Sequence, residues 1–186
     1  QELYNDDIFV GYRYYDTFGV DVSYPFGYGG SYTSFAMSTK SVKADKDKVT
    51  VQVKVKNTGT VSGKEVAEVY FSAPDGELDK PYQELAGYAK TDELAPGESQ
   101  ILTISFDTKE MGSYDTDKAA YVMEDGDYII RVGNSSRNTH VAAKLNVAED
   151  TITEQYSNLM VPVTENDNIE NSDKYPTLEP MTTEGA

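Results

Sequence analysis

Carboxylates are the side chains that could support acid–base or metal chemistry here, because 32 Asp and Glu accompany one His and no Cys. Asp6 and Asp7 are adjacent, and neighbours on a strand point to opposite faces of a sheet, so they form no catalytic pair. The run Glu124-Asp125-Gly126-Asp127 offers oxygens to Ca²⁺, which takes about six to eight, but its spacing matches no calcium loop. A turn between two strands explains this run better, and the same holds for Asp115-Thr116-Asp117.

The other candidate reactive side chains are isolated in sequence. His140 is the single histidine, and a metal site draws several ligands, so we expect it at the surface beside the polar Asn138 and Thr139. Ser135 and Ser136 have the character of turn residues, with no base beside them. No phosphate-binding loop, nucleophile elbow or zinc-protease motif occurs. We therefore predict no catalytic, cofactor-binding or metal-ligating residue in this chain.

The charge of the chain restricts its partners. The 186 residues carry a formal net charge of −16, which argues against nucleic acid and against an anionic membrane surface, because both need a basic patch. No apolar run approaches the roughly 20 residues of a membrane helix. We expect a soluble protein, cytoplasmic or secreted, and the start at Gln1 suggests a processed chain or a piece of a longer one.

Hydrophobic periodicity predicts the fold class. Four valines alternate with polar residues between Val49 and Lys56, which indicates a strand with one buried face. Further apolar runs of strand length are separated by turn residues such as Asn57-Thr58-Gly59 and Leu94-Ala95-Pro96-Gly97. Roughly seven short strands and no helical repeat over residues 36–148 predict an all-β fold, an antiparallel β-sandwich.

Two flanking segments differ from this pattern. Residues 1–35 are an aromatic extension that holds seven of the 15 tyrosines, and the composition of residues 9–15 is typical of a strand. Aromatic side chains bring a large apolar area that must be covered, either by the following domain or by something outside the chain. Residues 149–186 are acidic and contain three prolines, which favours an extended linker or tail.

Several motifs, in a fixed order, resemble one known family. The chain is similar to the end of the second domain of family 3 glycoside hydrolases of the β-glucosidase type, followed by the fibronectin type III-like domain that accompanies them. The motifs that carry the resemblance are DIFVGYRYYD at 7–16, YPFGYGGSYT at 24–33, VKVKNTG at 53–59, GKEVAEVY at 63–70 and GDYIIRVGNSS at 126–136. Gly30 departs from the family, which usually has Leu there.

The resemblance implies an immunoglobulin-like β-sandwich and a division of the chain. Residues 1–35 would end an α/β sandwich domain and connect it onward, residues 36–148 would form the fibronectin type III-like domain, and residues 149–186 would be a linker or tail. In this family the nucleophilic Asp lies on a barrel domain and the acid/base Glu on the α/β sandwich, and neither motif matches this chain. The chain would be an accessory, structural part of a retaining glycosidase. The acidic segment also suits a permuted order in which the barrel comes last.

The aromatic extension is then predicted to dock on other domains of such an enzyme. The partners would be the α/β sandwich and barrel domains, in the same chain or a separate one. Without them we expect the chain to self-associate or to leave residues 1–30 disordered. A free-standing carbohydrate- or protein-binding module is the alternative, in which Tyr82, Tyr88 and Tyr114 could provide a sugar platform. The residues predicted to dock are Phe9, Tyr12, Arg13, Tyr14, Tyr15, Tyr24, Phe26 and Tyr28.

Overall fold

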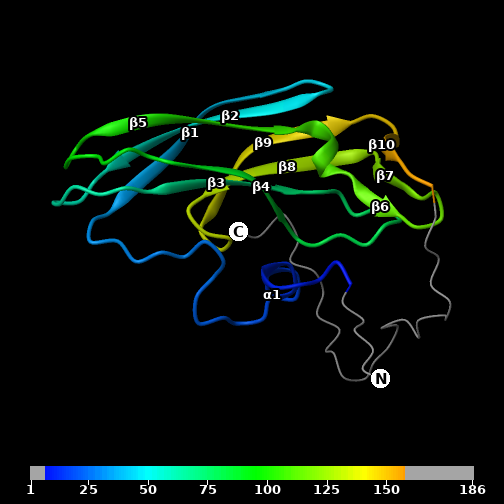
Figure 1. The fold of residues 1–186 in the computed structure, drawn as a ribbon, viewed down its shortest axis with the longest axis horizontal. Coiled ribbons are helices and arrows are strands. Elements are labelled where there is room, and N and C mark those ends of the chain that lie inside the picture. Colours follow the sequence, from blue (N-terminus) through cyan, green and yellow to red (C-terminus); the bar gives the residue numbers. More distant parts are fainter. Residues whose placement is uncertain (1–6, 158–186) are drawn as a thin grey trace.

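Alternating valines build the central strand of the first sheet. The computed structural model describes residues 7–157, and in it β2 (Lys48–Asn57) pairs antiparallel with β1 (Phe35–Ala44) on one side and β5 (Ser99–Asp107) on the other (Figure 1). All four valines of β2 are fully buried. The register sets Val53 opposite Leu102, so both strands turn their apolar side chains toward the same face of the sheet.

The second sheet has four antiparallel strands, in the order β4-β3-β8-β9. These strands are β3 (Val66–Ser72), β4 (Glu84–Lys90), β8 (Gly126–Gly133) and β9 (Thr139–Val147). Apolar residues of both sheets meet in one core, which includes Val51, Val53, Leu102, Ile104, Val69, Ile130 and Val132. The predicted all-β sandwich is thereby confirmed.

A third, smaller sheet joins one end of the sandwich. It consists of β6 (Ser113–Asp115), β7 (Ala120–Met123) and β10 (Thr151–Gln155), in the order β10-β7-β6. The 3-10 helix η1 (Thr108–Met111) leads from β5 into it. The part of the chain that the structure describes thus has ten strands where the sequence predicted about seven, because strands as short as β6 leave little periodicity to recognise.

The start of the acidic segment is structured. Residues 151–155, which the sequence assigned to a linker or tail, pair with β7 as β10. The rest of the predicted tail, residues 158–186, lies outside the described residues, as does Asp6.

The strand expected over residues 9–15 is wrong, because residues 9–11 belong to no strand and a helix begins at Tyr12. Residues Tyr12–Thr17 form α1, a helix of six residues that follows Gly11 with a φ of 60°. The composition favours a strand, but this stretch pairs with no strand and closes its hydrogen bonds locally, as from the Phe18 N–H to the Tyr14 carbonyl. No helix in residues 7–157 is long and apolar enough to cross a membrane.

A matched pair on β5 tests the position of the core. Ile104 is 3% exposed and Ile101 is 55% exposed on the same strand. We expect Ile104→Ala to lower the free energy of unfolding by about 2–5 kcal/mol and Ile101→Ala to change it by less than about 0.5 kcal/mol. Urea unfolding of both variants measures this, and similar losses for the two would contradict the assigned faces.

Candidate docking site

The aromatic segment, defined here as residues 7–34, lies on the outer face of the four-stranded sheet. Figure 1 shows α1 on the side of β3 and β4 that is turned away from β1, β2 and β5. The segment therefore forms a further layer on the sandwich, and its contacts with β3, β4 and the loop after β8 decide how it is held.

A buried carboxylate fastens this segment. Asp16, at 5% exposure, accepts hydrogen bonds from Arg137 Nε at 3.0 Å and from Gln83 Nε2 at 3.2 Å. Arg137 also donates from Nη2 to the carbonyls of Tyr15 and Val20. A buried charge needs a partner and hydrogen bonds to be tolerated, and both come here from loops that are distant in sequence.

Backbone groups of the sandwich bind two further side chains of α1. The Tyr82 N–H donates to Thr17 Oγ1 and the Leu85 N–H donates to the Tyr12 hydroxyl, each at 2.8 Å. Arg13 adds an ion pair with Glu84 at 2.9 Å. The helix thus satisfies donors at the start of β4 that would otherwise face an apolar layer.

The loop after α1 is fitted around Glu68. A Cβ at Gly27 would lie 2.4 Å from both carboxylate oxygens of Glu68, and Gly27 has a φ of 81°, so only glycine suits this position. Burial raises the pKa of Glu68, against a hydrogen bond donated by the Tyr70 hydroxyl at 2.6 Å. Burial and Glu68 together also raise the pKa of the Tyr70 hydroxyl.

The eight predicted docking residues divide into three groups. Tyr12 and Arg13 contact the sandwich itself, with the Tyr12 ring 6.2 Å from that of Tyr70. Phe9 and Tyr14 pack within the segment, both against Phe18. The remaining four are exposed, namely Tyr15, Tyr24, Phe26 and Tyr28, although Phe26 also stacks on Tyr12 with the ring centroids 4.5 Å apart.

Sequence reasoning missed the residues that anchor the segment. Asp16 ends the aromatic motif and Thr17 follows it, but neither was predicted to be buried, and the partners of Asp16, Arg137 and Gln83, lie 121 and 67 positions away from it. The one available signal in the sequence was an Asp next to a dense run of aromatic residues. A charged side chain rarely enters an aromatic layer unless partners there bind it.

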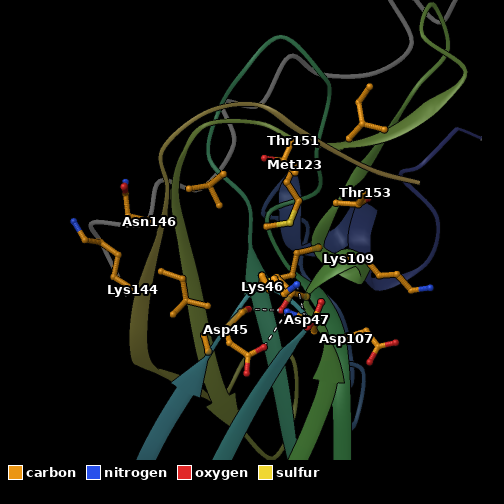
Figure 2. A pocket seen from close by; sticks show the side chains of 16 residues that line it. Asp45, Lys46, Asp47, Asp107, Lys109, Met123, Lys144, Asn146, Thr151 and Thr153 are labelled. Atoms are coloured by element: carbon orange, nitrogen blue, oxygen red, sulfur yellow. Dashed lines mark hydrogen bonds and ion pairs between the residues drawn. The ribbon is translucent and has the colours of Figure 1, made fainter. Parts of the chain in front are cut away.

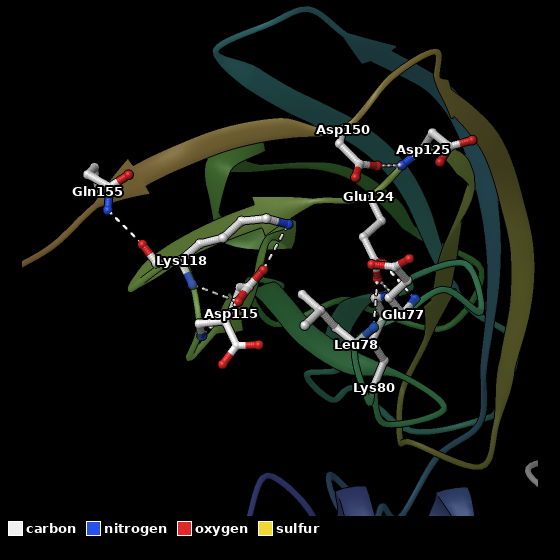
Figure 3. A network of polar contacts seen from close by, with 10 residues as sticks. Glu77, Leu78, Lys80, Asp115, Lys118, Glu124, Asp125, Asp150 and Gln155 are labelled. Carbon is white, nitrogen blue, oxygen red and sulfur yellow. Dashed lines mark hydrogen bonds and ion pairs between the residues drawn. The ribbon is translucent and has the colours of Figure 1, made fainter. Parts of the chain in front are cut away.

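The acidic turn Glu124–Asp127 acts as a structural clamp. Glu124 accepts hydrogen bonds from the Glu77 and Leu78 N–H groups and pairs with Lys80, fastening the loop between β3 and β4 (Figure 3). Burial opposes ionisation of Glu124, but these donors outweigh it and lower its pKa. Within residues 7–157 no group of three or more acidic or histidine side chains is placed to hold a metal ion.

A cleft of about 890 Å³ opens at the end of the sandwich near the β1–β2 hairpin (Figure 2). Its lining includes charges of both signs, among them Lys46, Asp47 and Lys109, together with Met111 and Met123. His140 lies elsewhere, exposed on β9 and 3.1 Å from Thr39 Oγ1 through its Nε2. Neither place joins a base to a nucleophile, so the docked aromatic segment remains the functional candidate.

Comparison with known proteins identifies the sandwich. A family model described as a fibronectin type III-like domain matches residues 65–136. This part of the chain is a fibronectin type III-like domain. The chain is also 43% identical over 169 residues to a β-glucosidase of Ruminococcus albus, covering 88% of this chain. The resemblance to family 3 glycoside hydrolases that the motifs indicated is confirmed.

Solved structures show the same relationship. A β-glucosidase of Paenibacillus barengoltzii superposes with a TM-score of 0.80 and 46% identity over 84% of this chain. β-Glucosidase 3B of Thermotoga neapolitana, solved in complex with α-D-glucose, superposes with a TM-score of 0.75 and 45% identity over 80% of this chain. The chain spans 18% of the Ruminococcus enzyme, and 19% and 20% of these two solved chains. In these relatives the fibronectin type III-like domain and the catalytic domains share one chain.

Removing the buried carboxylate should release the aromatic segment from the fibronectin type III-like domain. In Asp16→Ala, Arg137 and Gln83 lose their shared acceptor, so we expect amide exchange of residues 12–18 to accelerate at least tenfold while β2 and β8 stay protected. Hydrogen exchange with mass spectrometry measures both regions. Asp21→Ala, at an exposed position of the same segment, is the control, and unchanged protection in Asp16→Ala would contradict the anchoring role.

The buried Glu68 predicts a pH dependence with a defined sign. Its pKa is raised above 4.5, so the folded state binds the proton more tightly and stability falls as pH rises from 4.5 through the raised value. Glu68→Gln keeps an acceptor for Tyr70 but does not titrate. As pH increases over this range, the free energy of unfolding of this variant should therefore rise relative to that of the wild type.

Urea unfolding between about pH 4 and pH 8 measures this difference. Asp127→Asn is the control, because hydrogen bonds from Lys144 and Asn146 lower the pKa of Asp127 below 3.8. Its pH-dependent contribution therefore changes only below about pH 4, and this variant should run parallel to the wild type over the measured range. Parallel curves for Glu68→Gln and the wild type would refute the prediction.

Proposed function

We propose that this chain is the accessory, structural part of a β-glucosidase-like retaining glycoside hydrolase that hydrolyses O-glycosyl bonds. The two catalytic carboxylates of such an enzyme would lie outside this chain, on the α/β sandwich and barrel domains. The observation that carries the proposal is the two-sided aromatic segment, which is fastened to the sandwich on one side and exposes large aromatic rings on the other.

The outer side of the segment has the composition of an interface. Tyr24 is 72% exposed and Tyr28 is 58% exposed, with their rings 5.2 Å apart. Fully burying a large apolar side chain is worth about 1.5–3 kcal/mol, so covering Tyr15, Tyr24, Phe26 and Tyr28 together would contribute several kcal/mol to domain association. Tyrosine suits such a surface because its ring becomes buried while its hydroxyl finds a polar partner.

The role of the inner contacts is to hold these rings at fixed positions. Asp16, Thr17 and Tyr12 join α1 to the loop and strand around β4. A partner domain bound to the outer rings would thereby be joined firmly to the sandwich, which would support the catalytic domains without contributing to the chemistry. Gly30 lies in open space, so a larger residue there would reach the partner rather than the sandwich.

The proposed division of the chain follows from this role. Residues 1–35 would complete an α/β sandwich domain and connect it onward, residues 36–148 would be the fibronectin type III-like domain, and residues 149–186 a linker or tail that begins with the paired strand β10. The α/β sandwich and barrel domains would be the partners, and neither nucleic acid nor a membrane would bind.

The docking role is tested by the double variant Tyr24→Ser and Tyr28→Ser, made both in this chain alone and in the full-length enzyme that carries it. In the isolated chain both rings are already exposed, so the midpoint of thermal unfolding should stay nearly unchanged. In the full-length enzyme we expect it to fall by about 2–8 °C.

Tyr88→Ser provides the control, since Tyr88 is 71% exposed on β4 outside the aromatic segment; it should change neither midpoint. Equal effects in both contexts would argue against docking. The isolated chain should also release no phenol from an aryl glucoside in a standard glucosidase assay, and turnover would contradict the accessory role.

A carbohydrate-binding module is the second candidate, favoured by one cluster of tyrosines. Tyr114 lies 5.3 Å from Tyr121, which lies 6.0 Å from Tyr156, and all three are partly exposed on the small sheet. The platform predicted from sequence is not formed as such, because Tyr82 packs against Arg131 and Tyr88 is not in this cluster. Retention on insoluble glucan that is lost in Tyr121→Ala but kept in Tyr88→Ala would favour this candidate.

A further inference from the structure

Five lysines share the outer face of the three-stranded sheet. Strand register places Lys54 between Ser38 on β1 and Ile101 on β5, and Lys56 beside Ala36 and Ser99. The outward residues are the exposed or half-buried ones that alternate with the buried valines of β2. Strand register places Lys43, Lys48, Lys54 and Lys56 outward, and Lys40 is exposed in the bulge of β1 between Thr39 and Ser41. These five residues are named here the lysine face.

The lysine face has almost no carboxylate of its own. Asp107, opposite Lys48, is the one acidic residue at an outward position of β1, β2 and β5, and none of the five lysines makes an ion pair within residues 7–157. Asp45 and Asp47 lie in the hairpin loop at the end of the face, where Asp45 is occupied by the N–H groups of Asp47 and Lys48.

Polar side chains fill most positions between the lysines, with Ala36 and Ile101 as apolar exceptions. Ser41 donates to Gln52 at 3.1 Å, and the hydroxyls of Thr50 and Ser105 are 3.0 Å apart. The face is therefore cationic and hydrogen-bonding, and it lies on the opposite side of the sandwich from the aromatic segment (Figure 1). A net charge of −16 predicted no basic patch, and the structure shows that the negative charge is not spread evenly.

Charge complementarity points to an anionic occupant, and the chain contains one. Residues 158–186 have six carboxylates and one lysine, a net charge of −5. Residues 1–157 carry a net charge of −11, which is the whole-chain charge of −16 less the −5 of residues 158–186. A polyanion that is not attached to the chain would therefore be repelled by it at low salt. A tethered segment has an effective concentration of the order of millimolar, which favours it over a free competitor.

The length of the segment is sufficient. It contains 29 residues, which can span up to roughly 95 Å at about 3.3 Å per residue, whereas a ten-residue strand such as β2 measures roughly 33 Å. We propose that the acidic segment 158–186 binds across the lysine face of the same chain. It would cover the exposed edge strand β1 as well, where unpaired backbone groups otherwise invite another strand.

The test is the rate at which the five lysines are acetylated in the full 186-residue chain, followed residue by residue by mass spectrometry. The comparison is a full-length variant in which the segment keeps its length but loses its charge. Lys64 and Lys90, exposed outside the lysine face, are internal references. The neutral variant carries Glu165→Gln, Asp167→Asn, Glu170→Gln, Asp173→Asn, Glu179→Gln and Glu184→Gln.

We expect the lysine face to react about threefold more slowly in the wild-type chain than in the neutral variant at low salt, and equally in about 1 M NaCl, where the Debye length falls to about 3 Å. Lys64 and Lys90 should react alike in both chains. Equal rates at low salt would overturn the proposal. Protection that grows with protein concentration would also overturn it, since the occupant would then be a second copy. Neither result bears on the docking of the aromatic segment, which uses other residues.

Discussion

The buried carboxylate of Asp16 is the interaction on which the arrangement of this protein depends. It neutralises Arg137, gives Gln83 an acceptor and thereby joins the helix at one end of the chain to the loop after β8. An ionised carboxylate inside an aromatic layer is unfavourable unless such partners surround it. The same pairing fixes the position of α1, because Asp16 meets Gln83 and Arg137 where the loops before β4 and after β8 come together.

The docked helix gives the domain two faces of different chemistry. The aromatic segment covers the four-stranded sheet with exposed rings, whereas the three-stranded sheet presents ammonium, hydroxyl and amide groups. Both outer surfaces are built on strands of one core, so they are held at a fixed separation. A domain of this kind can contact an apolar neighbour on one side without that neighbour disturbing the charged side.

The sequence was sufficient for the features that depend on local periodicity. The valines of β2 and the turn at 57–59 predicted a strand and its end, and the core lies where the alternation placed it. It was insufficient where distant residues decide. The composition of residues 9–15 favoured a strand, but Asp16 and Thr17 find their partners at Gln83, Arg137 and Tyr82, and these contacts select a helix.

Charge was misleading for a related reason. A total for the whole chain contains no information about which face a residue occupies, and the lysines of β1 and β2 became one surface only when strand pairing set their register. The tyrosines behave similarly. Tyr114 and Tyr121 are directly opposite each other on β6 and β7, whereas Tyr82, which is equally aromatic in sequence, packs against Arg131.

The separation in sequence between Asp16 and Arg137 has a consequence for the order of events during synthesis. Arg137 follows Asp16 by 121 residues, which a ribosome adds in roughly 6–24 s at about 5–20 residues per second. For that time the Asp16 carboxylate has no Arg137 to pair with, so the aromatic segment cannot be fastened to the sandwich. The layer that would join the two domains is therefore completed only after most of the sandwich strands have been made.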